Sequence, residues 1–428
     1  MSDNQQHIIK KQRVNVHFRG SQTDALALQS SLSDVLKSKR IEGAIAQVLS
    51  EFSNENEYLI LEKIEIDLGI FLPENIEQTP FLETLQDALR KQISDAIPEA
   101  ILKGKQIYKS IQVIDYEQFI FFLEQGFFEQ LPIKLISEKG INSFQDWLKA
   151  LIEQLNFSQI QHLKTLIFQN FMVRQRLIFQ LSNENFVLII KKIITANTEN
   201  NYHIEESLWQ IKDVVSKQIL LDKILLSSSQ NLQNLFNNEN NKQANHESKK
   251  QAIDTIDSTI KEAIFIQNAG IVLLHPFIFM MYKALGWTEK GIFKDNVTQQ
   301  KAILMWHYLA TGSQDVAEYA LVLPKILCGM SPQTPLGEIE FLSETEQQEA
   351  EAMLQAVIDN WHILKNTSPD GLRAEFLQRD GKLDPHSLGG LTLTVEKKAS
   401  DILLNSLTWG ISLVKFDCMK EIIYINWS

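Results

Sequence analysis

A polar segment at residues 227–251 interrupts a sequence that is otherwise rich in apolar residues, and it limits where a core can form. It reads SSSQNLQNLFNNENNKQANHESKKQ, with many Asn, Gln, Ser and Lys residues and few β-branched ones. Such a composition buries too little apolar surface to offset the conformational entropy that ordering would cost. We therefore expect a polar linker over residues 227–252. The alternative is a polar excursion within a helical hairpin.

The stretch before this segment, residues 80–226, has the pattern of a helical region. Segments such as FLETLQDALRKQI, FQDWLKALIEQL and NENFVLIIKKII place apolar residues at steps of three and four, which is the spacing of one face of a helix. The spacings between these segments are short, which favours antiparallel helical hairpins over one continuous rod.

Residues 1–79 have a mixed pattern that predicts a small α+β unit. Apolar and polar residues alternate from Val14 to Phe18, as in a half-buried strand. Two helical patterns follow, and EYLILEKIEIDLG then offers a second strand around Ile64. We expect the Val14 strand and the Ile64 strand to pair, with the two helices covering one face of the pair.

Residues 253–428 predict an α+β domain with its helices first and its strands last. A helix from Leu273 to Leu285 is interrupted or begins at Pro276, a second one stops at Gly312, and another opens with the capping box Ser343-x-x-Glu346. LTLTVEKK, ISLVKF and EIIYINW read as strands, with a helix, ASDILLNSL, between the first two. The expected fold class is therefore α+β: mostly helical, with a small N-terminal α+β unit, a helical middle and a C-terminal α+β domain ending in a small antiparallel sheet.

Composition excludes some classes of function. The formal net charge is −12, whereas a nucleic-acid-binding protein normally carries a basic face. The most membrane-like run, AGIVLLHPFIFMMYKALGW, contains His275, Pro276 and Lys283, so it is better interpreted as a buried helix. The start of the chain has no apolar core of a signal peptide, and the two cysteines have no paired spacing. We expect a protein made in the cytoplasm, with no nucleic-acid partner and no membrane insertion.

The densest group of charged residues is NTSPDGLRAEFLQRDGKL, residues 366–383. Each charge has a local structural explanation. Ser368 or Thr367 can cap a short helix that begins near Pro369, Asp370 can pair with Arg373, and Glu375 with Arg379. Leu372, Phe376 and Leu377 would form its buried side, and Asp380-Gly381 would end it as a turn. We interpret this segment as a folding motif.

The rest of the sequence offers no recognised catalytic motif. It contains no phosphate-binding glycine loop, no dinucleotide fingerprint, no nucleophile elbow and no metalloprotease helix. His275, His307, His362 and His386 lie apart in the sequence, without metal-ligand spacing. We therefore expect no catalytic, cofactor-binding or metal site. The alternative is an enzyme or effector cargo whose site forms only in three dimensions, with Asp370, Arg373, Arg379 and the histidines as its first suspects.

The order of motifs over residues 265–427 resembles the tape measure proteins of contractile injection systems, the phage-tail-like particles that bacteria release. The matching stretches are NAGIVLLHPF, KAILMWHYLATG, EYALVLPKILCGM, VIDNWHILKNTSPDGLRAEFLQRDGKL, VEKKASDILLNSLTWGISLVKF and YINW. IIKKQRVNVHF and LEKIEIDLG are similar near the N-terminus, and FLEQGFFEQLP resembles a shorter motif but lacks the Trp common near its end. The family-motif residues, which we expect to be structural, are Asn268, Gly270, His275, Pro276, Asn366, Pro369, Asp370, Gly371, Arg373, Arg379, Trp409 and Gly410.

The resemblance implies a non-enzymatic structural role in particle assembly. A protein of this family is expected to set the length of the inner tube through contacts at its two ends. Its partners would be tube, baseplate or spike proteins, and it would lie in the cytoplasm during assembly and then inside the particle. The alternative within this class is a baseplate adaptor or assembly chaperone. The contour length limits what a single copy could measure. Residues 80–229 as one helix would span only about 220 Å at about 1.5 Å per residue, which suits a short tube.

Overall fold

The computed structural model describes residues 7, 9, 12–25, 28, 32, 36, 38–54, 57–72, 78–132, 135, 141–196, 213–226, 260 and 262–427. The chain divides into two compact units, an N-terminal unit of Met1–Asp115 and a C-terminal unit of Tyr116–Ser428. The predicted linker, residues 227–252, lies outside the described residues. The finer division into regions 1–79, 80–226, 227–252 and 253–428 stays a prediction.

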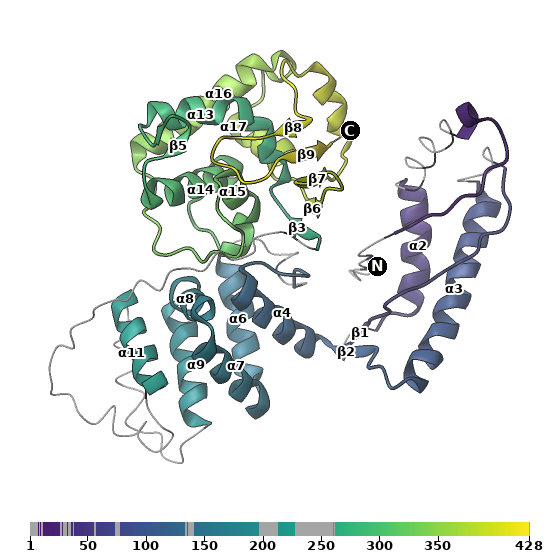
Figure 1. Ribbon diagram of the computed structural model, residues 1–428, viewed down its shortest axis with the longest axis horizontal. Coiled ribbons are helices and arrows are strands. Elements are labelled where there is room, and N and C mark those ends of the chain that lie inside the picture. The colour runs from purple at the N-terminus through teal and green to yellow at the C-terminus, as the bar shows by residue number, and fades with distance from the viewer. Residues whose placement is uncertain are drawn as a thin grey trace. The chain divides into compact units, whose positions relative to one another are not determined.

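Two helices form the core of the N-terminal unit, α2 (Lys39–Glu51) and α3 (Thr79–Leu102), which pack along each other (Figure 1). The side chain of Ser38 caps α2 by accepting a hydrogen bond from the backbone N–H of Ile41. Two small clusters of apolar side chains hold the pair together, and their fully buried members are Ile41, Val48, Phe81, Leu85, Leu89 and Ile93. The second of the two helical patterns that follow the Val14–Phe18 segment is confirmed as α2.

The strand pair predicted for this unit is wrong. Residues 14–18 and 60–72 run without strand structure, and the strands in this part of the described chain are β1 (Glu57–Leu59) and β2 (Tyr108–Ser110), which pair antiparallel. The alternation around Ile64 has another cause. Ile64, Ile66 and Leu68 pack against the helix pair, so the period of two reflects burial against helices and not hydrogen bonding to a neighbouring strand.

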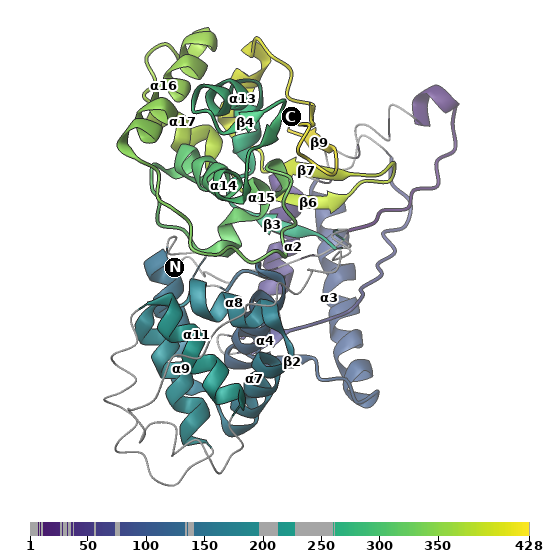
Figure 2. The same cartoon turned by 60° about the vertical axis from the view of Figure 1, so that its left-hand side comes forward.

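The first part of the C-terminal unit is helical, as the sequence predicts (Figure 2). Its described helices are α4 (Ile111–Gln125, which begins in the other unit), α6 (Ile141–Gln154), α7 (Phe157–Gln169), α8 (Phe171–Gln180), α9 (Asn183–Thr195) and α11 (Val214–Leu226). Side chains of Asn156, Asn170 and Ser182 cap α7, α8 and α9, which explains why adjacent helices can follow with almost no loop. One continuous apolar core joins these helices.

A second, larger core lies under the helices that follow. They are the 3₁₀ helix η2 (Ala269–Leu274), α13 (His275–Ala284), α14 (Asn296–Thr311), η3 (Glu318–Leu321), α15 (Val322–Leu327), α16 (Glu344–Asn360), η4 (His362–Leu364), α17 (Pro369–Leu372) and the π-helical turn η5 (Arg373–Leu377). The regular α-helix α13 begins at His275, one residue before the predicted Pro276, which lies in its first turn. Two sequence predictions are confirmed: α14 stops at Gly312 with φ of 74°, and Ser343 and Glu346 form the capping box of α16.

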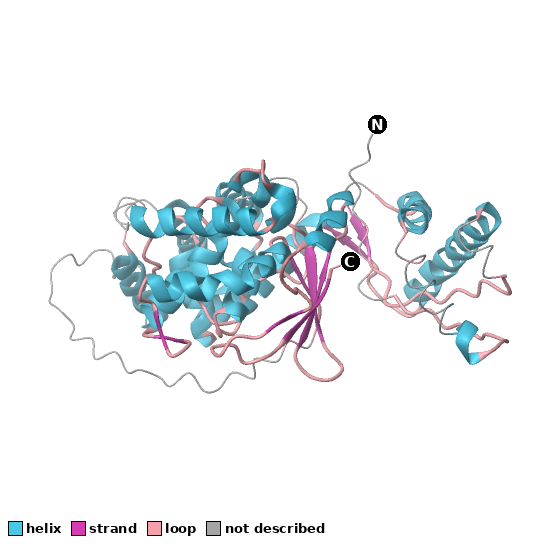
Figure 3. Cartoon of the chain, turned by 90° about the horizontal axis from the view of Figure 1, so that it is seen from above, coloured by secondary structure: helices cyan, strands magenta, loops and turns pink. Residues whose placement is uncertain are grey.

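The strands of this unit form a five-stranded sheet with the order β3-β6-β7-β9-β8 (Figure 3). The strands are β3 (Ile264–Ile266), β6 (Gly381–Pro385), β7 (Leu391–Val395), β8 (Leu413–Val414) and β9 (Ile423–Asn426); β4 (Thr288–Glu289) and β5 (Ile292–Phe293) form a separate hairpin. The helix predicted at ASDILLNSL is the 3₁₀ helix η6 (Ala399–Ser406). Leu391, Leu393 and Val395 are buried while Thr392 and Thr394 between them are not, so one face of the sheet covers the core.

The expected fold class is confirmed: the protein is mostly helical and α+β. One detail of the sheet differs, because β7 and β9 pair in parallel while its other pairs are antiparallel. The long connection through η6 and β8 lets the chain return to the same end of the sheet before β9 begins, and a parallel pair requires a crossover of this kind.

Candidate functional site

Three charged residues with no exposed surface join the helical first part of the C-terminal unit to its motif-bearing second part. Arg176 on α8, Glu318 at the start of η3 and Lys325 on α15 are at most 1% exposed. Nε of Arg176 lies 3.2 Å from one oxygen of the Glu318 carboxylate, and Nζ of Lys325 donates to the other oxygen at 2.6 Å. The single carboxylate therefore binds both cations, and we call these three residues the buried charge network.

Backbone carbonyls complete the coordination of both cations. Nη1 of Arg176 donates to the carbonyls of Leu123 and Glu124, at the end of α4. Three consecutive carbonyls of one loop, those of Pro332, Gln333 and Thr334, accept the remaining hydrogen bonds from Lys325 and Arg176. This satisfaction by carbonyls is what makes burial of charged groups tolerable.

Gly126 leaves the space that the buried charge network occupies. Its φ is +83°, and a Cβ at this position would lie 2.7 Å from Nη2 of Arg176 and 2.7 Å from Oε1 of Glu318. Both the backbone conformation and the close approach require glycine here. This glycine belongs to the FLEQGFFEQLP motif of the sequence, so its structural reason is now visible.

The network carries two positive charges against one negative charge, and burial disfavours the excess. Burial lowers the pKa of Lys325 to about 8, and the Glu318 carboxylate partly opposes that change. Burial also lowers the pKa of Arg176, although the guanidinium remains charged. The buried charge network has no exposed atoms that a substrate could contact, so it serves to hold α8, η3 and α15 together.

Arg373 forms a second junction, between η5 and the helices α14 and α16. Its Nε donates to the carbonyl of Leu309 at 3.2 Å, Nη1 lies 2.8 Å from the Asp370 carboxylate, and Nη2 pairs with Glu351. The predicted pairing of Asp370 with Arg373 is therefore confirmed. Because Arg373 is 5% exposed, its guanidinium serves the packing of three elements.

Arg379 forms a third junction, and here one prediction is wrong. Its side chain is fully buried and binds the Asp401 carboxylate through Nη1 at 2.9 Å and Nη2 at 3.0 Å. Glu375, the predicted partner, contributes its backbone carbonyl instead of its carboxylate. The π-helical turn from Arg373 to Leu377 changes the spacing of side chains, so the ordinary helical rule of four does not apply to this pair.

The other motif residues near η2 also have structural contacts. Nδ2 of Asn268 donates to the carbonyl of Ala320 at 3.0 Å, and the indole N–H of Trp409 donates to the carbonyl of Leu273 at 3.1 Å. A Cβ at Gly270 would lie 1.7 Å from the carbonyl oxygen of Phe376, so only glycine allows η2 to approach η5. Nδ1 of His275 lies 3.0 Å from the carbonyl of Val272, and Pro276 occupies the first turn of α13.

The remaining motif residues lie in or beside α17 or at an open surface. Ser368 caps α17 by accepting from the backbone N–H of Gly371, with Pro369 as the first helical residue and Asn366 exposed in the preceding turn. A Cβ at Gly371 would lie 2.9 Å from Thr367. Nothing lies within 4 Å of a Cβ placed at Gly410, so packing gives no reason for glycine there.

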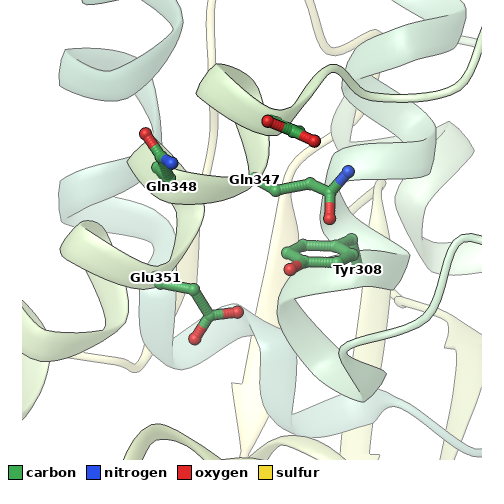
Figure 4. Close-up of a pocket in the computed structure, with 5 residues that line it drawn as sticks. Tyr308, Gln347, Gln348 and Glu351 are labelled. Atoms are coloured by element: carbon green, nitrogen blue, oxygen red, sulfur yellow. The ribbon is translucent and has the colours of Figure 1, made fainter.

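An open pocket of about 380 Å³ lies between α14 and α16 (Figure 4). Its lining residues are Tyr308, Glu344, Gln347, Gln348 and Glu351. The side chain of Gln347 extends over the Tyr308 ring, and Glu351, which faces the same space, is paired with Arg373. Burial raises the pKa of Tyr308, and the neighbouring Glu351 carboxylate raises it further.

The suspected catalytic residues do not converge on this pocket. Arg373 touches its lining twice, through its pair with Glu351 and through the Tyr308 ring, whose centroid lies 5.7 Å from its guanidinium carbon. Arg379 pairs with Asp401 elsewhere. The ring of His386 stacks on Tyr424, and His307 is buried within α14. Within the described residues no group of three possible metal ligands occurs, and no helix of that part is long and apolar enough to cross a membrane.

Sequence reasoning missed the buried charge network, although a signal for it exists. Glu318 and Lys325 lie in EYALVLPKILCGM, a largely apolar segment, and a charge in such a segment must find a partner. Its third member, Arg176, is 142 residues away from Glu318. No local pattern could therefore have identified it.

The charged residues at these three junctions pair with carboxylates and backbone carbonyls inside the fold, so their role there is structural. The class of protein comes from the comparison with protein families. The model of the contractile injection system tape measure protein family matches residues 6–427, nearly the whole chain. The chain therefore belongs to this family of structural proteins, and the resemblance found in its motifs is confirmed. No curated protein and no solved structure matches it.

Proposed function

We propose that this protein sets the length of the inner tube of a contractile injection particle, through contacts that it makes at its two ends. Membership of the tape measure family over residues 6–427 is the observation that supports this role. The expected partners are tube, baseplate or spike proteins. The protein acts without catalysis, in the cytoplasm while the particle assembles and then inside the particle.

The motif residues serve this role indirectly, as determinants of a rigid fold. Arg373 and Arg379 each bind at least one carboxylate and one backbone carbonyl from different elements. We propose that replacing either one lowers the stability of the C-terminal unit before it alters any contact with a particle protein. A variant with an unchanged melting temperature that no longer supports particle assembly would contradict this.

The compactness of the C-terminal unit favours a second candidate, a baseplate adaptor or assembly chaperone. The longest described helix, α3, has 24 residues and spans only about 36 Å at about 1.5 Å per residue. Roughly 310 residues in one compact unit have a radius of gyration of about 20 Å. A folded copy of this size reaches both ends only of a short tube, whereas an adaptor needs no such reach.

Tube length in particles from cells that carry altered genes distinguishes the two candidates. Insertions of increasing length within residues 227–251 extend the chain at a polar segment, without adding residues to any described helix or strand. Tubes that lengthen in proportion to the insertion support length determination. The parts that flank this segment are joined by the buried charge network, so tubes of constant length, in normal numbers, contradict a ruler stretched through this segment and favour the adaptor or a ruler that stays folded.

A matched control keeps the length of the chain and changes only its sequence. Residues 227–251 are scrambled without changing their number or composition. Length determination predicts normal tubes from this variant, because only the number of residues matters. A scrambled segment that changes tube length would instead indicate that these residues contact a partner by sequence.

A further inference from the structure

Residues 12–19 of the N-terminal unit form a segment without helix or strand structure that is exposed throughout. Residues 12–19 have no strand partner among the described residues, and every side chain from 12 to 20 is exposed. Val14, Val16 and Phe18 are 46%, 53% and 37% exposed, and polar residues alternate with them. This is the pattern of a half-buried strand with an apolar face, but much of that apolar face is exposed in the described part of the unit.

A second segment of the same unit has a covered side and an open backbone. Ile64, Ile66 and Leu68 of residues 60–68 pack against α2 and α3. Glu65 and Asp67, which alternate with them, are exposed. In the described chain the residues from 60 to 68 do not belong to a strand. The N–H of Ile60 donates to the carbonyl of Ile107 at 2.8 Å, and the backbone groups of residues 61–68 have no backbone partner among the described residues. These groups can therefore accept a strand from another molecule, as exposed strand edges do.

The two segments are complementary in charge as well as in pattern. The first has Arg13 and Arg19 on the face opposite its valines. The second has Glu65 and Asp67 on the face opposite its isoleucines, together with Lys63, whose Nζ lies 2.5 Å from the Glu65 carboxylate, so that face keeps a net negative charge. Opposite charges on neighbouring strands are favourable and like charges are unfavourable. One copy therefore carries both halves of a matching pair, which is what a two-fold symmetric interface requires.

We propose that two copies of this chain associate through their N-terminal units, with residues 12–19 of each copy pairing as a strand with residues 60–68 of the other. The two segments of a single copy are not strands and share no backbone hydrogen bond with each other, so each is available to a second molecule. Exchange between identical copies satisfies both at once and covers Val14, Val16 and Phe18.

Light scattering on the chain of residues 1–428 tests the association. The dimer has twice the monomer mass of 49.2 kDa and dissociates on dilution. Val16→Pro removes a backbone donor and disfavours the strand, so this variant should be a monomer. Val16→Thr retains a β-branched residue and the donor and should remain a dimer. Because residue 16 is exposed in the single copy, unchanged helical circular dichroism in both variants shows that the fold is intact.

A charge exchange distinguishes pairing between copies from any other cause of association. Arg13→Glu/Arg19→Glu places like charges at both strand pairs of its own dimer, and so does Glu65→Lys/Asp67→Lys. Each variant alone should associate more weakly than the wild type. A mixture of the two should form a heterodimer, because both of its strand pairs then bring opposite charges together. A wild-type chain that stays monomeric across the micromolar range, or a mixture that forms no heterodimer, overturns the proposal.

Discussion

Glu318→Gln is the substitution that most directly probes the interior of the C-terminal unit. It keeps the shape of the side chain but leaves Arg176 and Lys325 as two buried cations without a carboxylate. Removing one partner of a buried ion pair costs about 3–5 kcal/mol. We expect the free energy of unfolding of the C-terminal unit to fall by about 4 kcal/mol at pH 7.

The two cations contribute differently to this loss. Lys325 has a pKa of about 8 in the folded protein. In the variant at pH 7 it can lose its proton and so avoid being a buried charge without a carboxylate, at a free-energy cost of about 1.4 kcal/mol per unit between its pKa and the pH. Arg176 cannot lose its proton in this range, so most of the loss comes from it. At pH 9 Lys325 is already largely neutral, and the effect of Glu318→Gln should be smaller by about 1 kcal/mol.

Thermal unfolding measures this loss. An unfolding entropy of about 2.1 cal/mol/K per residue over roughly 310 residues converts 4 kcal/mol into a decrease in Tm of about 6 °C. Adding Lys325→Met to Glu318→Gln removes one orphaned cation and should recover part of the decrease. Glu344→Gln, an exposed residue of α16, is the matched control and should leave Tm unchanged. A Tm for Glu318→Gln within about 1 °C of the wild type would refute the reasoning.

Three further predictions follow from the same unit and are read by thermal or urea unfolding. Gly126→Ala should lower the free energy of unfolding by about 2 kcal/mol, because the φ of Gly126 is positive and the new methyl group meets Arg176 and Glu318. The control, Gly43→Ala in α2 of the N-terminal unit, has open space around the new methyl group and should raise that unit's free energy of unfolding by up to about 1 kcal/mol. A stabilising Gly126→Ala with a destabilising Gly43→Ala would contradict the packing. Gly270→Ala should prevent the normal fold, since its Cβ would lie 1.7 Å from a backbone oxygen, and a native Tm contradicts this. Burial lowers the pKa of His307 from 6.5 to about 4; the unfolded chain binds the proton first as pH falls from 6.5 to 4, so stability decreases by up to about 3 kcal/mol over that window. His307→Gln should reduce the slope, and an unchanged slope would assign it to other groups.

Local features of the fold could be predicted from the sequence because their causes are local. The capping box of Ser343 and Glu346, the stop of α14 at Gly312 and the Ser368 cap each depend on hydrogen bonds or backbone angles within a few residues. The same holds for Asp370 and Arg373, which lie one helical turn apart. Their geometry is set before any distant part of the chain is involved.

Pairings across the sequence could not be predicted, because the choice of partner depends on the whole fold. β6 occupies Gly381–Pro385, where Asp380-Gly381 suggested only a turn, since β3 and β7 lie on either side of it. β9 runs parallel to β7 for a similar reason. Arg379 prefers the bidentate Asp401 to its near neighbour Glu375, because that pairing also ties η6 to the sheet.

The folded state of the C-terminal unit determines what a tube-length experiment can measure. Each inserted residue adds about 3.3 Å if it lies in an extended chain and about 1.5 Å if it lies in a helix. A residue added to a flexible segment between two folded parts adds less, because the mean span grows only with the square root of length. A slope near 3.3 Å per residue therefore requires that the chain is stretched inside the tube. Tension of that kind would act on the buried charge network. Glu318→Gln should therefore change the length or number of the tubes only if the C-terminal unit must stay folded to stop tube growth. Normal tubes from Glu318→Gln together with a steep slope would show that this unit opens during assembly, and shortened or missing tubes would show that it measures while folded.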